Sequence, residues 1–195
     1  MNHKVITISR EFGSGGRTIG REVAEKLGIR CYDSELIEKI AEESGLAKEY
    51  IENKDEDALH GNQLTSVFSS YHFFNSIPTQ DYLWSIQKEV ILKLAAEESC
   101  VIVGRCADYI LGDRENCLKV FIHAAAEKRA ERIVNVYGER KDSPEKRLQD
   151  KDKRRKAYYR FYTDMPWGIA QNYHICLDSG VLGIEKCVQL IAELY

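Results

Sequence analysis

Hydrophobic residues recur along the chain in two alternating patterns, which predict strands and helices in turn. Short, continuous apolar runs at 5–9 (VITIS), 100–103 (CVIV) and 118–122 (LKVFI) predict strands, as do shorter segments at 29–32 and 173–177. Continuous runs, unlike alternating ones, are typical of strands that are covered on both faces. The pattern therefore favours a parallel sheet with flanking helices.

Helical periodicity separates these runs. Apolar residues at 19, 23, 24 and 27 share one helix face that stops at Gly28, and a second helix is predicted from about Ser34 to Gly45. Further helices are predicted over about 83–94, 125–137 and 184–191. Residues 46–79 show no periodicity that predicts an element, and no internal repeat is present.

The composition fits one soluble domain. A chain of 195 residues, 44% of them hydrophobic, is long enough to bury a core. No run approaches the roughly 18 apolar residues of a membrane span, and the first residues lack the apolar core of a secretory signal. Six scattered cysteines without a CxxC pair predict reduced thiols instead of a disulfide framework or a zinc site. We therefore expect a cytoplasmic protein with no membrane partner.

The net charge of −3 conceals a basic segment. Between residues 126 and 160 there are 13 Lys and Arg against 7 Asp and Glu, so the rest of the chain is acidic. A basic segment in an acidic protein favours an anionic ligand held locally over a surface made for nucleic acid. A solvated, salt-bridged helix is the alternative.

The most informative stretch joins the first predicted strand to the first predicted helix through a glycine-rich turn. Glycines permit positive φ and let backbone N–H groups approach an anion, and the helix N-terminus adds unpaired donors. The order therefore predicts a phosphate-binding loop, with a simple turn as the alternative. Its predicted residues are Gly13, Ser14, Gly15, Gly16, Arg17 and Thr18.

This loop departs twice from the P-loop pattern GxxxxGK[ST], because residues 11–18 read EFGSGGRT. Glu11 replaces the first glycine, and we expect it to be anchored away from phosphate. Arg17 replaces the lysine and keeps a positive charge whose planar fork can hold two phosphate oxygens. Thr18 retains the hydroxyl that a P-loop offers to Mg²⁺, so Mg²⁺ with ATP is the expected cofactor.

Four segments, REFGSGGRTIG, CYDSELI, VGRCADYIL and KDKRRKAYYRFYT, resemble the cytidylate-kinase-like family over nearly the whole chain. The resemblance implies an α/β fold, a P-loop NTPase three-layer sandwich with a five-stranded parallel sheet. It implies a single domain with a core of about 1–45, 84–137 and 166–195, a helical monophosphate-binding insertion at about 33–80 and a lid at about 138–165. It also implies transfer of the γ-phosphoryl group of ATP to a nucleoside monophosphate, with CMP or dCMP as first candidates.

The resemblance places three residues at the acceptor. Asp33 and Ser34 follow the second strand, where the family holds the acceptor's sugar and phosphate, and Arg105 matches the arginine of a DGRD motif that contacts it. From the residues alone, Asp33 and Ser34 could instead cap a helix, and Arg105 could form a structural ion pair.

The resemblance also supplies the predicted catalytic set. Asp152 and Arg155 fit a DxxR motif near the end of the lid, whose members reach the acceptor and the transferring phosphates. Arg132, with Arg129 beside it, lies on the helix that leads into the lid, and Arg17 completes the set. The aromatic residues at 158–162 are expected to pack the lid against the core, with stacking on a base as the alternative.

Both acidic positions of the DGRD motif are lost, as Val103 and Cys106, and this leaves the acceptor's base open. Asp108, two residues further on, is a candidate replacement. The acceptor could therefore be another nucleotide or a small phosphorylated metabolite. A nucleotide-binding sensor without turnover is the alternative from another class, and nucleic-acid binding is disfavoured by the acidic residues within the basic segment. The oligomeric state stays open.

Overall fold

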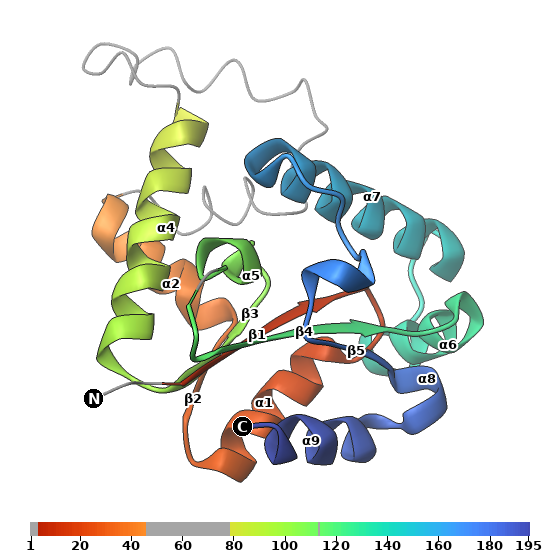
Figure 1. Cartoon of the computed structure of the whole chain (residues 1–195). Coiled ribbons are helices and arrows are strands. Elements are labelled where there is room, and N and C mark those ends of the chain that lie inside the picture. Colours follow the sequence, from red (N-terminus) through yellow and green to blue (C-terminus); the bar gives the residue numbers. More distant parts are fainter. Residues whose placement is uncertain (1–3, 46–78, 113) are drawn as a thin grey trace.

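The computed structural model describes residues 4–45, 79–112 and 114–195, which form a three-layer α/β sandwich (Figure 1). The central sheet has the strand order β2-β3-β1-β4-β5, and every neighbouring pair is parallel. This confirms the predicted parallel sheet. Its strands are β1 (Val5–Arg10), β2 (Arg30–Tyr32), β3 (Cys100–Val103), β4 (Cys117–His123) and β5 (Ile175–Asp178).

The helices α1, α2, α4, α6 and α9 lie where the periodicity predicts them. The longest helix, α7, was not predicted, because its basic and aromatic residues form no apolar stripe of helical period. Two helices of four residues, α5 and α8, were not predicted, because they are too short to show a period. The predicted strand at 173–177 begins later, at Ile175, because the N–H of Tyr173 closes the preceding 3₁₀ turn on Ala170 (3.1 Å). The predicted insertion at 33–80 falls largely on residues 46–78, which lie outside the described residues. The described helices are α1 (Gly16–Leu27), α2 (Ser34–Ser44), α4 (Thr79–Glu97), α5 (Ala107–Ile110), α6 (Ala126–Tyr137), α7 (Pro144–Thr163), α8 (Ser179–Leu182) and α9 (Ile184–Glu193), with the 3₁₀ turn η2 (Ala170–Asn172).

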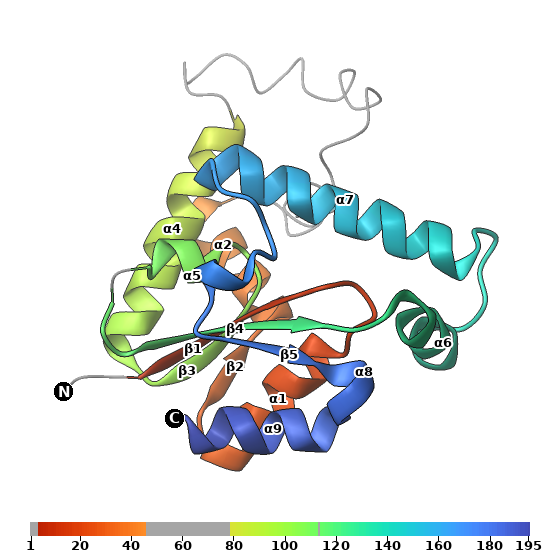
Figure 2. The same cartoon turned by 45° about the vertical axis from the view of Figure 1, so that its right-hand side comes forward.

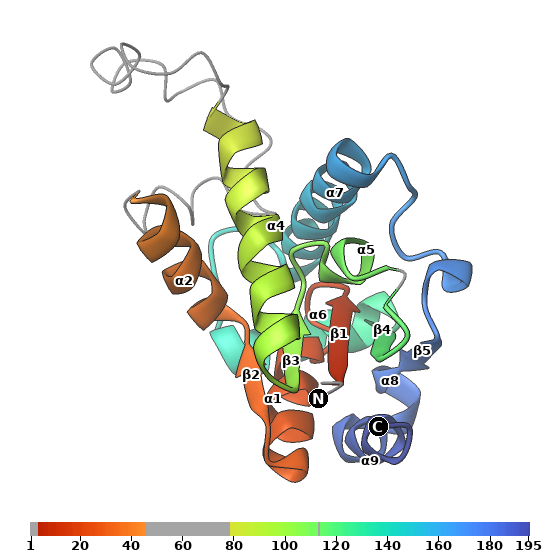
Figure 3. The ribbon, with the colours of Figure 1, turned by 60° about the vertical axis from the view of Figure 1, so that its left-hand side comes forward.

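Apolar side chains project from both faces of the sheet. On β1, Val5 belongs to the cluster formed with α2 and α4, whereas Ile6 and Ile8 belong to the cluster formed with α1 and α9. Figure 3 shows α2 and α4 side by side over one face, with α1 and α9 on the other. Covered faces explain why the strands read as continuous apolar runs.

The 20-residue helix α7 crosses the molecule beyond the carboxyl ends of the strands (Figure 2). It begins with Pro144 after a Ser143 cap, whose hydroxyl accepts from the Lys146 N–H at 3.3 Å. Towards its other end, Tyr158 and Tyr159 are buried with Cys106. Tyr158 and Tyr159, with the partly buried Tyr162, therefore pack α7 against the core as expected, whereas Phe161 is exposed.

All six cysteines are free thiols, and four of them are buried. Among the helices of the described residues, none combines the length and the apolar character that crossing a membrane requires.

Candidate active site

The glycine-rich turn lies between β1 and α1, in the predicted order. Gly13 and Gly15 have φ of 80° and 82°, in the left-handed region that favours glycine. A Cβ on Gly15 would lie 3.0 Å from Cζ of Arg132, and one on Gly16 would lie 2.5 Å from Cβ of Arg10. Glycine is therefore required at both positions, and the loop leads directly into the N-terminus of α1, where backbone N–H groups can receive an anion.

Glu11 lines the cleft, and its carboxylate is held by the backbone after β4 and by Arg129. Its Oε2 accepts from the Ala124 N–H at 3.2 Å and lies 3.3 Å from Nε of Arg129. Its carbonyl accepts from the Ser14 hydroxyl at 2.9 Å. Ser14 is buried, and its own carbonyl accepts from the Ser179 hydroxyl at 2.6 Å, so this predicted phosphate-binding side chain stabilises the turn from behind.

A cleft of about 820 Å³ opens beside the loop, between the starts of α1 and α2, the end of β3, and α6 and α7. Ten of its 24 lining residues are Lys or Arg, against four Asp or Glu. Such an excess of positive charge beside a glycine-rich loop fits an anion with several charges. The basic lining residues are Arg10, Arg17, Arg105, Arg132, Arg140, Lys141, Arg147, Lys151, Arg154 and Arg155.

One face of α7 forms a basic wall of this cleft. Arg147, Lys151, Arg154 and Arg155 follow one another at i, i+4, i+7 and i+8, which places them on one side of a helix. Of these four residues, only Arg155 is predicted individually from the sequence. The helical spacing of basic residues after Pro144 is the signal that could have found the others.

Of the predicted catalytic residues on α6 and α7, two line the cleft and one binds the backbone of the glycine-rich loop. Arg132 lines the cleft, and its Nη2 donates to Oγ1 of Thr18 at 3.4 Å. Arg155 also lines it and donates from Nη1 to the Arg10 carbonyl at 3.0 Å. Asp152 is not among the lining residues, because its carboxylate binds the Phe12 N–H at 2.7 Å and Arg129. Its catalytic role stays a prediction.

Arg17 and Asp33 form an ion pair across the cleft floor, between the start of α1 and the N-terminus of α2. Asp33 occupies the N-cap position of α2 but makes no side-chain capping hydrogen bond, so the alternative role as a cap is not supported for this residue. Ser34 lines the cleft beside it. The pair thus joins a residue predicted to bind the phosphates of ATP to a residue predicted to bind the phosphoryl acceptor.

Arg105 reaches the cleft wall through an unusual stretch of backbone. Gly104, Arg105 and Cys106 have φ of 76°, 60° and 53°, and two of these residues are not glycine. Left-handed non-glycine residues are strained and tend to occur at functional sites. Gln87 supports the turn, because its Nε2 donates to the Arg105 carbonyl at 3.0 Å. Sequence alone gives no signal for this conformation.

Asp108 does not lie where it could replace the lost acids of the DGRD motif. It is buried on α5 and accepts from the Ser9 hydroxyl at 3.2 Å and the Tyr159 hydroxyl at 2.8 Å. Burial, and then the charge of Asp108, raise the pKa of Tyr159 well above its usual value, so the phenol stays protonated and donates. Asp108 is absent from the cleft lining, so the expected replacement receives no support.

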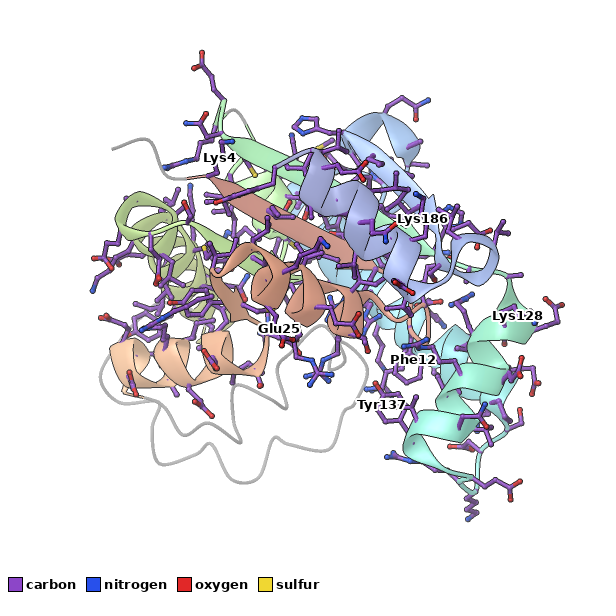
Figure 4. All side chains as sticks on the ribbon, turned by 90° about the horizontal axis from the view of Figure 1, so that it is seen from below. Lys4, Phe12, Glu25, Lys128, Tyr137 and Lys186 are labelled. Carbon is purple, nitrogen blue, oxygen red and sulfur yellow. The ribbon has the colours of Figure 1, made fainter. Side chains whose placement is uncertain are left out.

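An aromatic pair that the sequence analysis missed forms one rim of the cleft. Phe12 and Tyr137 are stacked with ring centroids 6.0 Å apart and an interplanar angle of 12° (Figure 4). Both residues line the cleft. They lie 125 positions apart in the sequence, and no local pattern connects them.

A glycine-rich loop between a central parallel strand and a helix, in a five-stranded parallel sheet with helices on both faces, defines an α/β protein with the P-loop fold. Residues 5–181 match the model of the cytidylate kinase-like family, and the chain belongs to this family. A cytidylate kinase from Methanopyrus kandleri is 28% identical over 186 residues, which cover 90% of this chain and 84% of that protein.

Solved structures agree on the fold. An uncharacterized protein from Eubacterium ventriosum is 27% identical with a TM-score of 0.72, and the match covers 98% of each chain. A shikimate kinase from Acinetobacter baumannii, in complex with shikimate, has 18% identity and a TM-score of 0.55, over 98% of this chain and 92% of that one. A gluconokinase from Sinorhizobium meliloti has 16% identity and a TM-score of 0.56, over 99% and 94%. Membership of the family supports a phosphotransferase, and these solved structures show its fold.

The Arg17–Asp33 pair predicts that removing the carboxylate strengthens phosphate binding. In Asp33→Asn, Arg17 is released, so we expect inorganic tripolyphosphate to bind up to about fivefold more tightly, the range of an exposed ion pair. Titration calorimetry measures the affinity. Asp142→Asn is the control, because it removes another cleft carboxylate, one that pairs with Lys146. Equal gains in both variants would show a general charge effect and contradict the specific competition for Arg17.

Proposed function

We propose that this protein transfers the γ-phosphoryl group of ATP to a nucleoside monophosphate, with CMP or dCMP as the first candidates. The observation that carries the proposal is the convergence of the glycine-rich loop, the basic face of α7 and Arg105 on one cleft. Phosphoryl transfer requires positioning and charge neutralisation more than covalent chemistry, and this cleft offers both. Membership of the family and the likeness to a protein named cytidylate kinase support the same class of acceptor.

The donor and acceptor take opposite parts of the cleft in this proposal. The phosphates of ATP bind the N–H groups of the glycine-rich loop, and Arg17 exchanges Asp33 for phosphate oxygen. Arg132 and Arg155 neutralise charge on the phosphoryl group in transfer. Ser34, Arg105 and the released Asp33 then hold the acceptor, and the lining residues of α7 exclude water when both substrates are bound.

Thr18 is the residue that fits Mg²⁺ in this cleft. It is a lining residue at the start of α1, in the position where a P-loop offers a hydroxyl to the metal. Among the described residues, no group of three or more His, Cys, Asp and Glu side chains could hold a metal ion. This suits an ion that arrives with ATP, because Mg²⁺ in kinases takes several ligands from phosphates and water. Bound Mg²⁺ would neutralise charge on the β- and γ-phosphates.

A different acceptor is favoured by one observation. Val103 lines the cleft at a position where the family motif has a carboxylate, and Cys106, at the other lost position, is buried among the aromatic residues of α7. An acceptor other than CMP, either another nucleotide or a small phosphorylated metabolite, would suit these changes.

A screen of ATP consumption with every nucleoside monophosphate tests the proposal. We expect turnover with at least one of them, and the highest kcat/KM with CMP or dCMP. Turnover with another phosphorylated acceptor alone would identify the second candidate. Binding of ATP without consumption, whichever acceptor is added, would contradict both and indicate a nucleotide-binding sensor.

Replacement of Arg17 tests the phosphate loop. If its charge is aimed at the phosphates, Arg17→Ala lowers kcat/KM by about 10²–10³, or about 3–4 kcal/mol. Arg17→Lys restores part of the loss, because the charge returns without the planar fork. Arg21→Ala, one turn further along α1 on an exposed position, serves as the control and keeps wild-type activity. Steady-state kinetics with saturating acceptor measure kcat/KM for ATP in each variant. An Arg17→Ala variant with near-wild-type activity would contradict the role of Arg17 in phosphate binding.

Replacement of Arg105 tests the acceptor side. Arg105→Ala should raise KM for the monophosphate by about 10–100-fold, the loss of a hydrogen bond to a charged group, and change KM for ATP far less. Arg114→Ala is the control, because this arginine donates to the Ala95 carbonyl (2.7 Å) and does not line the cleft. A larger change in KM for ATP would place Arg105 at the donor instead.

A further inference from the structure

The peptide of Phe12, near the start of the phosphate loop, is held from both sides by charged side chains. Its N–H donates to Oδ1 of Asp152 at 2.7 Å, and its carbonyl accepts from Nη1 of Arg129 at 3.1 Å. Asp152 lies on α7 and Arg129 on α6, and both side chains are only 11% exposed. Two helices from the C-terminal half of the chain therefore converge on one peptide of the loop.

Arg129 connects this peptide to the residue that departs from the P-loop pattern. Its Nη1 lies 2.5 Å from Oδ2 of Asp152, and its Nε lies 3.3 Å from Oε2 of Glu11 and donates to the Ala124 carbonyl at 3.0 Å. One guanidinium thus neutralises two carboxylates that would be unfavourable to bury alone. Only the planar, five-donor fork of arginine reaches all these oxygens in a fixed geometry.

The loop itself packs directly on α6. A Cβ on Gly13 would lie 2.9 Å from the Arg129 carbonyl and 2.9 Å from Cγ2 of Ile133. The backbone of α6 therefore limits the path of the loop on one side, while Asp152 fixes it on the other. Glu11, which stands where the pattern has a glycine, adds a carboxylate contact to Arg129 at the start of the loop.

We propose that Asp152 and Arg129 are positioning residues for phosphate binding, which fix the Phe12 peptide and so aim the N–H groups after it at the phosphates of the ligand. The inference rests on the proposed function and deepens it. The family resemblance places Asp152 at the acceptor and the reacting phosphates, whereas here its carboxylate is behind the loop. Arg155, three residues later on α7, is the one that reaches the cleft and binds the Arg10 carbonyl. The same helix thus fixes the loop and presents arginines to its ligand.

Inorganic tripolyphosphate is the probe for this role, because its affinity measures phosphate binding at the loop without a contribution from a nucleoside. Asp152→Ala should weaken its binding by about tenfold or more, the loss of charge-assisted hydrogen bonds, and speed hydrogen exchange at the Phe12 amide in the free protein. Asp152→Asn keeps an oxygen for that N–H but no charge for Arg129, so an intermediate loss is expected and the fold is disturbed less. Arg129→Lys should resemble Asp152→Ala.

The matched control caps the same helix. Asp164→Asn removes the charge of the exposed Arg160–Asp164 pair at the C-cap of α7, keeps a side chain that tolerates the left-handed backbone there, and should leave both tripolyphosphate binding and Phe12 exchange unchanged. Calorimetry and exchange followed by NMR provide the two measurements, with thermal unfolding of each variant beside them.

Two results would overturn the positioning role. If Asp152→Ala and Asp152→Asn raise the monophosphate KM or lower kcat while tripolyphosphate affinity stays at the wild-type value, Asp152 contacts the reacting groups directly. If they lower only the melting temperature, Asp152 stabilises the fold without setting the loop. Failure of the proposed function gives a different pattern: tripolyphosphate affinity then depends on Asp152, yet no nucleoside monophosphate is phosphorylated.

Discussion

A phosphate-binding loop is subject to one constraint. Its backbone N–H groups must stay available for the phosphates, so other contacts have to fix the conformation of the loop. In this protein the holding contacts come from outside the loop. Glu11 is tied to the connection between β4 and α6, and Ser14 is tied to Ser179. The Phe12 peptide is tied to α6 and α7. The loop is thus fixed from behind, while the side that faces the cleft is left for an anion.

The sheet places the other parts of the site around this loop. Because β1 lies between β3 and β4 and all strands are parallel, the segments after β1, β2 and β3 emerge at the same edge. That edge carries the glycine-rich loop, the Asp33–Ser34 start of α2 and the strained turn at Arg105. Ligand sites of open parallel sheets occur at this edge for the same reason. The helix α7 then closes the cleft with positive charge from a distant part of the chain.

Much of this arrangement could be predicted from local sequence. Continuous apolar runs predicted the parallel sheet, and glycines between a strand and a helix predicted the phosphate loop, because both signals arise from neighbouring residues. Long-range contacts carry no such signal. The spacing of Asp152 and Arg155 places them near each other on a helix, but only the packing of α7 decides which faces the cleft. The stacked Phe12 and Tyr137, and the left-handed backbone of Arg105 and Cys106, depend on tertiary contacts in the same way.

The central claim is that α7 is anchored to the phosphate loop from Asp152 onward, and that the basic segment before this point becomes more ordered when phosphates fill the cleft. Hydrogen exchange with and without a bisubstrate ligand, cytidine and adenosine joined by five phosphates, tests it most directly. Residues 152–163 should be protected already in the free protein, and residues 140–151 and the 13–18 loop should gain protection with the ligand. If residues 152–163 exchange freely until the ligand binds, the whole of α7 is mobile. The phosphate loop then cannot be held by Asp152, and the claim is wrong.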